Sequence, residues 1–253
     1  MFLEEGDPSV PAEGPNLRRC TYIRWIPPLP ASWESLWMRV EAVVFDAGET
    51  LFDETRMWDA WADWLSIPRL TLLTTLGAVI ARGQHHSEVF RTFKPDFDMA
   101  EEMRARIQAG VFPRFELADL YPDAVPTLET LKRHHYRVGV VGNQPSGFTS
   151  CMAEIGIELD LLTSSGDLGV EKPDPAFFTA ISERLQLAPN KIAYVGDRVD
   201  NDVLPAQSVG MLGIFLLRGP WGHIPEHPEV PYTIDSLEEL LPLLDADRVQ
   251  PRL

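Results

Sequence analysis

Aspartates follow two of the apolar runs in this 253-residue chain. Asp46 ends the run that begins at Val40, and Asp197 lies just beyond the run 192–195, with Asp202 a short way further on. In an open parallel sheet the ligand binds beyond the carboxyl ends of the strands, so we expect the three carboxylates to meet at one edge. Carboxylates this close raise each other's pKa unless a cation neutralises them, and oxygen ligands favour Mg²⁺. The pattern therefore indicates a magnesium site.

A lysine and an amide are expected at the same edge. Lys172 lies in the loop 171–175, before a predicted helix, and Gly142 with Asn143 ends the apolar run 138–141. The lysine would balance the charge of a carboxylate nucleophile and a phosphoryl group, because phosphoryl transfer depends on electrostatic stabilisation and positioning. An aspartate nucleophile splits hydrolysis into formation and breakdown of an acyl phosphate. Taken alone, Asp46 could cap a turn, Lys172 could be a solvated loop residue, and the segment 197–202 could cap a helix. The interpretation therefore depends on their common edge.

The elements that would position these residues alternate between short apolar runs and helical segments. The runs 40–45, 138–141, 192–195 and 212–216 are rich in valine and isoleucine, as parallel strands covered on both faces are. Val125, Leu128 and Leu131 recur with the spacing of an amphipathic helix. We therefore expect an α/β fold with a doubly wound parallel sheet, formed by residues 38–54 and 121–253.

Residues 55–120 contain no such strand and are expected to form a small all-helical cap inserted after the first strand. Trp58, Trp61 and Leu65 lie on one helical stripe, which we interpret as packing rather than a ligand cage. The same segment holds a basic cluster, which we interpret as a solvated face, with contact to a substrate phosphate or sugar acid as the alternative. The cluster consists of Arg82, His85, His86, Arg91 and Lys94.

Residues 1–37 are proline-rich and show neither helical nor strand periodicity, so we expect a flexible N-terminal extension. Because Met38 directly precedes the first strand-like run, translation from Met38 is an alternative that would leave the extension out of the natural protein.

Composition excludes several classes of function. The formal net charge of −16 disfavours non-specific nucleic-acid binding, and the longest uncharged apolar stretch, 70–81, is shorter than the ~20 residues that a bilayer crossing needs. The acidic start of the chain is unlike a secretory signal, and Cys20 with Cys151 forms neither a disulfide framework nor a zinc cluster. We expect a cytoplasmic protein, monomer or homodimer, without a nucleic-acid or membrane partner.

These residues resemble the haloacid dehalogenase (HAD) superfamily over about 38–244. The matching motifs are Asp46-Ala47-Gly48-Glu49-Thr50, then Gly142-Asn143, then Lys172-Pro173-Asp174-Pro175 followed by Phe177 and Phe178, and lastly Gly196-Asp197 through Asn201-Asp202. The resemblance implies a Rossmann-like core, and the insertion is similar to the family's C1-type cap, which closes over the site. It also implies a Mg²⁺-dependent hydrolase, most simply a phosphatase acting on a small phosphorylated metabolite.

The resemblance also assigns roles to single residues. It implies that the catalytic residues are Asp46, which attacks phosphorus, Lys172 and Asn143. The phosphoryl group would be bound by Gly142, Asn143 and Lys172. The metal would be held by Asp46, Asp197, Asp202 and the main-chain carbonyl of Gly48.

The sequence departs from the family at two positions. Family phosphatases usually have an aspartate in place of Gly48, where it protonates the leaving group and later activates water, a contribution of about 10²- to 10⁴-fold. Glu49 and Asp53 are the candidates to replace it. Where the family commonly has serine or threonine, this chain has Gly142, so main-chain N–H groups and the Asn143 amide would supply the missing hydrogen bond.

Two alternatives to a phosphatase stay open. One is a dehalogenase that attacks carbon through Asp46, against which the metal motif argues, since the carbon-attacking relatives need no magnesium. The other is a binding or regulatory protein with the same fold and low activity, which the glycines at 48 and 142 support.

Overall fold

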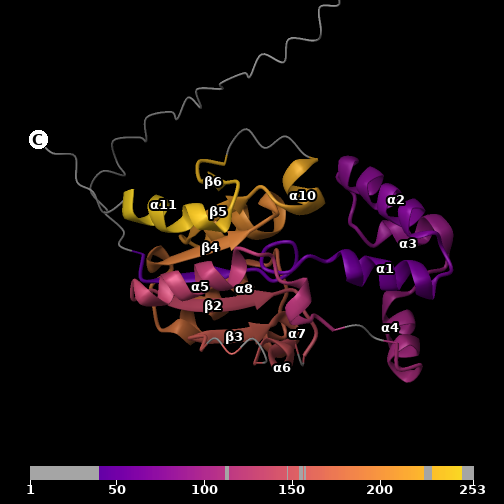
Figure 1. Cartoon of the computed structure of the whole chain (residues 1–253), viewed down its shortest axis with the longest axis horizontal. Coiled ribbons are helices and arrows are strands. Elements are labelled where there is room, and N and C mark those ends of the chain that lie inside the picture. The colour runs from indigo at the N-terminus through magenta and orange to yellow at the C-terminus, as the bar shows by residue number, and fades with distance from the viewer. Residues whose placement is uncertain are drawn as a thin grey trace, which may run out of the picture. The chain divides into compact units, whose positions relative to one another are not determined.

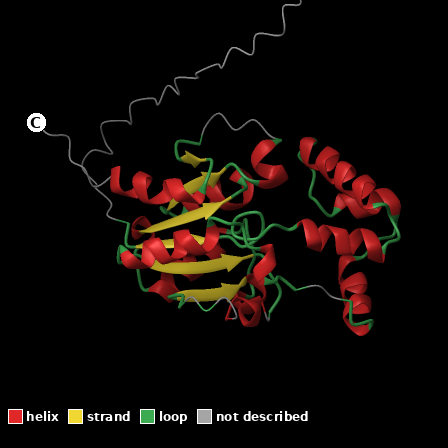
Figure 2. Cartoon of the chain, viewed as in Figure 1, coloured by secondary structure: helices red, strands yellow, loops and turns green. Residues whose placement is uncertain are grey.

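The sheet holds six strands among the residues that the computed structural model describes, which are 40–111, 114–146, 148–153, 156, 158–224 and 230–246. The expected N-terminal extension and Cys20 lie outside them. The strand order is β3-β2-β1-β4-β5-β6, and every neighbouring pair is parallel (Figure 2). The strands are β1 Ala42–Phe45, β2 Arg137–Gly142, β3 Leu161–Ser164, β4 Ile192–Gly196, β5 Leu212–Leu216 and β6 Thr233–Ile234. This confirms the expected doubly wound α/β fold.

Successive side chains of the central strand β1 pack into different halves of the core. Val43 and Phe45 belong to a cluster that includes side chains of α5 (Ala124–Arg133) and α11 (Leu240–Ala246). Ala42 and Val44 pack with side chains of α8 (Pro175–Leu185) and α9 (Leu204–Ser208). Because side chains alternate across a strand and both faces are covered by helices, every residue of β1 is buried and apolar.

The helices of this core follow the strands in the chain. They are α5 Ala124–Arg133, α6 Phe148–Ala153, α7 Ser165–Leu168, α8 Pro175–Leu185, α9 Leu204–Ser208, α10 Gly219–His223 and α11 Leu240–Ala246, with the 3₁₀ turns η1 Leu117–Asp119, η2 Pro189–Lys191 and η4 Leu237–Glu239, and the π-helical turn η3 Val199–Val203.

Four helices lie between β1 and α5, and the first three of them share a hydrophobic cluster of their own (Figure 1). They are α1 Thr55–Trp64, α2 Arg69–Ala81, α3 Glu88–Phe93 and α4 Met99–Gln108. Trp58 is buried in this cluster, and Trp61 and Leu65 pack against it. We refer to these helices as the cap; its limits at 55 and 120 stay a prediction.

The carboxyl ends of the strands are directed toward the cap, as the arrowheads in Figure 2 show. No single helix in the described part of the chain is long and apolar enough to cross a bilayer; α1 and α2 reach that length and composition only together, and they are bent by 114° at their junction.

Candidate active site

Three aspartates from separate parts of the sequence meet at the carboxyl edge of the sheet. Asp46 follows β1, Asp197 follows β4, and Asp202 lies in the turn η3. One carboxylate oxygen from each lies within 4.8 Å of the other two, and all three residues are buried. The geometry therefore brings together the three side chains in which the sequence predicts metal ligands.

Lys172 places a positive charge among these carboxylates. Its Nζ lies 2.8 Å from Asp46 Oδ1 and 2.6 Å from Asp202 Oδ1, and its side chain is 1% exposed. Burial works to lower the pKa of Lys172, but the facing Asp202 and Asp46 carboxylates outweigh it and hold that pKa well above its ordinary value. The lysine is therefore charged and orients Asp46.

The carboxylate set fits a divalent cation. One lysine cannot balance three carboxylates, and Asp197 Oδ2 is buried without a hydrogen-bond partner among the described residues. Burial and the Asp202 and Asp46 charges raise the pKa of Asp197 well above its ordinary value, and burial raises that of Asp202 to about 6 despite Lys172. An oxygen-only site with excess negative charge suits a hard ion such as Mg²⁺.

Two glycines make this close approach possible. A Cβ atom at Gly196 would lie less than 3.0 Å from the Asp202 carboxylate, and one at Gly142 less than 3.0 Å from Asp46 Oδ1. A serine or threonine at 142 would therefore displace the Asp46 carboxylate.

The Asn143 side chain forms hydrogen bonds with both main-chain groups of Lys172. Its Nδ2 donates to the carbonyl of Lys172 at 3.0 Å, and its Oδ1 accepts from the N–H of Lys172 at 2.8 Å. The asparagine thus fixes the segment from which Lys172 reaches Asp46. The role expected for its amide toward phosphate stays a prediction.

The space beside Gly48 is filled by a residue that the sequence analysis did not select, Glu54. A Cβ atom at Gly48 would lie less than 3.0 Å from both Oε1 and Cδ of Glu54. Burial raises the pKa of Glu54 to about 8, with the nearby Glu49 and Asp46 charges adding to the effect. Glu54 therefore places a carboxyl group where an aspartate side chain at position 48 would begin.

The two candidates named from the sequence have other partners. Glu49 Oε1 accepts from the N–H of Glu54 at 3.0 Å, and its Oε2 accepts from the Tyr121 hydroxyl at 2.8 Å. Asp53 Oδ1 accepts from the N–H of Thr55 at 2.7 Å, at the start of α1. Such roles are typical of helix starts and loops.

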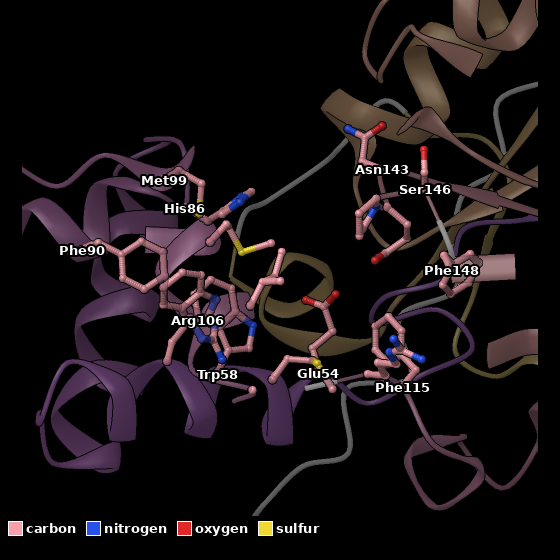
Figure 3. A pocket seen from close by; sticks show the side chains of 18 residues that line it. Glu54, Trp58, His86, Phe90, Met99, Arg106, Phe115, Asn143, Ser146 and Phe148 are labelled. Atoms are coloured by element: carbon pink, nitrogen blue, oxygen red, sulfur yellow. The ribbon is translucent and has the colours of Figure 1, made fainter. Parts of the chain in front are cut away.

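A cavity of about 710 Å³ lies between the cap and the carboxyl edge of the sheet. Figure 3 shows Glu54 pointing into it between cap side chains such as Trp58 and core side chains such as Phe148. The apolar and aromatic residues of its wall are Met57, Trp58, Trp61, Phe90, Met99, Met103, Ile107, Phe115 and Phe148. The interpretation of the tryptophan stripe as packing is therefore incomplete, since Trp58 and Trp61 also face this cavity.

Of the basic cluster predicted in the cap, His86 alone is among the residues that line the cavity. Burial lowers the pKa of His86 to about 4, so the ring is neutral at pH 7. Arg91 pairs with Glu88 and Lys94 with Glu102. Arg106, which the sequence analysis did not select, reaches the cavity wall and lies over the Trp61 ring at 4.0 Å.

A family model described as haloacid dehalogenase-like hydrolase matches residues 40–210. The glyceraldehyde 3-phosphate phosphatase of Methanocaldococcus jannaschii is 32% identical over 130 residues, 49% of this chain and 56% of that protein. The phosphoglycolate phosphatase of Salmonella typhi is 28% identical over 193 residues, covering 72% of this chain and 70% of that protein. The chain therefore spans little more than half the length of the archaeal relative.

Solved structures share the fold. The crystal structure of a HAD phosphatase from Thermococcus onnurineus superposes with a TM-score of 0.54 at 25% identity, covering 83% of this chain and all of that one.

Proposed function

Because this chain belongs to the haloacid dehalogenase-like hydrolases, we propose that it is a Mg²⁺-dependent phosphatase that acts on a small phosphorylated molecule. The observation that carries the proposal is the buried group of Asp46, Asp197 and Asp202 around Lys172. A cavity of about 710 Å³ lies nearby, lined in part by Asn143, whose amide binds the main chain of Lys172. The names of the relatives, phosphatases of glyceraldehyde 3-phosphate and of phosphoglycolate, support phosphomonoesters as the substrate class.

In the proposed reaction Asp46 is the nucleophile. One of its oxygens bonds to phosphorus as the bond from phosphorus to the ester oxygen breaks, which leaves an acyl phosphate on Asp46. Water then attacks that phosphorus, inorganic phosphate leaves, and Asp46 is regenerated. Lys172 holds the Asp46 carboxylate in place and offsets the charge of the phosphoryl oxygens.

The metal would be held by Asp46, Asp197, Asp202 and the main-chain carbonyl of Gly48. Bound there, Mg²⁺ supplies positive charge that offsets the carboxylates and the phosphoryl oxygens. Asn143 fixes the main chain at Lys172, and Gly142 leaves room for the Asp46 carboxylate beside the phosphoryl group.

We assign the acid role to Glu54. Its carboxyl group fills the space beside Gly48 and points into the cavity that would receive the leaving group (Figure 3). There it would donate a proton to the departing ester oxygen and then accept one from the attacking water, so that its protonation state is restored after each cycle.

We propose a cytoplasmic enzyme, monomer or homodimer, whose partner is its small-molecule substrate rather than nucleic acid or a membrane.

Phosphate release from a panel of phosphomonoesters tests the proposal. We expect turnover with Mg²⁺, loss of turnover with EDTA, and loss of at least about 10³-fold in Asp46→Asn, because an amide side chain cannot form the acyl phosphate. Asp53→Asn is the matched control and should keep activity, because asparagine also caps a helix start.

Two results would refute the proposal. One is equal turnover of the wild type and Asp46→Asn. The other is release of halide from 2-haloacids without added metal, which would favour the dehalogenase instead.

A further inference from the structure

Helix α4 presents an apolar stripe that the core of the cap does not use. Met99, Met103 and Ile107 recur at every fourth position, so they share one face of the helix. None of them belongs to the hydrophobic cluster of the cap, and Met99 and Ile107 are 36% and 59% exposed. All three line the cavity. An apolar face left against a cavity, rather than packed into a core, indicates a ligand surface.

Polar contacts on another face of α4 fix the direction of this stripe. The carboxylate of Glu102 accepts from Trp64 Nε1 at 2.7 Å and pairs with Lys94. The Arg106 guanidinium lies over the Trp61 ring. These contacts attach α4 to the remainder of the cap while the methionines and Ile107 stay toward the cavity.

The opposite wall of the cavity places two aromatic rings beside the polar side chains of Asn143, Gln144 and Ser146. Phe115 and Phe148 are buried parts of the core, and their ring centroids lie 6.0 Å apart (Figure 3). The volume of about 710 Å³ is in the range that receives a drug-sized ligand, about 300–1,000 Å³. A two- or three-carbon substrate would fill a small part of it and would leave the α4 stripe and the two rings in contact with water.

We infer that the substrate's organic group is large and mainly apolar, and that it binds between the α4 stripe of Met99, Met103 and Ile107 and the Phe115–Phe148 wall. This inference rests on the proposed function, since the phosphoryl group would lie at Asp46. It departs from the small polar phosphate esters named for the relatives.

A series of primary alkyl phosphates tests this inference. Ethyl, hexyl and octyl phosphate have leaving groups of similar acidity, so chain length alone changes. We expect kcat/KM to rise by up to about fourfold for each methylene that is buried, and by at least about tenfold from ethyl to octyl phosphate. A flat series, or a preference for 2-phosphoglycolate or glyceraldehyde 3-phosphate over octyl phosphate, would overturn the inference.

Ile107→Lys places a charge in the stripe. We expect it to lower the octyl-to-ethyl ratio of kcat/KM by about tenfold, because a buried alkyl chain would then contact an ammonium group. Gln108→Lys adds the same charge at the next position, which does not line the cavity, and should keep the wild-type ratio. If both variants keep it, the stripe does not bind the substrate. If the wild type is a dimer and Ile107→Lys dissociates it, the stripe contacts a second copy of the chain and not the substrate.

Binding to the Asp46→Asn variant separates this inference from the proposed function. Trp58 and Trp61 lie in the cavity wall, so tryptophan fluorescence reports a ligand there without turnover. Tighter binding of octyl than of ethyl phosphate supports the inference even if the wild type hydrolyses neither. Equal binding overturns it even if both are hydrolysed.

Discussion

At the scale of single residues, the site depends on which side chain fills each space. The Glu54 carboxyl group occupies the space next to Gly48, so an aspartate side chain at position 48 would overlap it. Glu49 holds the main chain of Glu54 through a hydrogen bond of 3.0 Å. In this chain the carboxyl group that faces the cavity therefore comes from the start of the cap rather than from the loop after β1.

Exchanging the two positions tests the role of Glu54. We expect Glu54→Ala to lower kcat for an alkyl phosphate by about 10²- to 10⁴-fold, and to lower it far less for 4-nitrophenyl phosphate, whose leaving group needs no proton. Adding Gly48→Asp should restore part of the lost activity, whereas Gly48→Asp alone should be impaired by the overlap. Equal losses on both esters would show that Glu54 does not act as the acid.

At the scale of elements, α4 is attached to the cap by polar contacts rather than by the hydrophobic cluster. The hydrogen bonds from Lys94 and Trp64 hold the pKa of Glu102 below its ordinary value of 4.5. A lowered pKa means that this stabilisation is complete above the ordinary pKa and is lost as the pH falls through the folded-state value.

The stability of Glu102→Gln tests that attachment. We expect a loss of up to about 1 kcal/mol at pH 7, since Lys94 is partly exposed to solvent, and a difference from the wild type that shrinks between pH 7 and pH 3 as Glu102 takes up a proton. Denaturant unfolding at the two pH values measures both. Glu101→Gln, on the same turn of α4, is the control for the helix charge. An equal loss at both pH values would contradict the ion-pair explanation.

At the scale of the whole molecule, the buried carboxylates of the site lower the stability of the fold when no cation is bound. The chain has a net charge of −16, and three carboxylates are buried around one lysine. Carboxylates held this close repel one another, so the fold without a cation stores unfavourable electrostatic energy at the sheet edge. Such a conflict between local preference and fold is characteristic of functional sites.

Thermal unfolding of Asp197→Asn tests this conflict. In EDTA we expect the variant to be more stable than the wild type by on the order of 1 kcal/mol or more, because one repelling charge is removed, while its activity is lost. Mg²⁺ should raise the Tm of the wild type and have little effect on the variant. Asp235→Asn, which removes an exposed carboxylate, should change neither the stability in EDTA nor the response of the Tm to Mg²⁺. A less stable Asp197→Asn variant would contradict the electrostatic argument.

The sequence alone was sufficient to predict the α/β fold and the strands β1, β2, β4 and β5 within a few residues. Buried parallel strands are continuous apolar runs, which can be read locally. It also predicted that Asp46, Lys172, Asp197 and Asp202 would meet, because the carboxyl ends of parallel strands share one edge. The strands β3 and β6 were missed, since they have four and two residues and β3 ends in Thr-Ser.

Only the tertiary structure placed Glu54 beside Gly48, tied Asn143 to the main chain of Lys172, and left the stripe of α4 against a cavity. Each of these depends on atoms brought together across long stretches of chain or on the space that a missing side chain leaves. Periodicity and motif spacing describe the order of residues along an element, but which side chain fills a gap between elements is decided by packing in three dimensions.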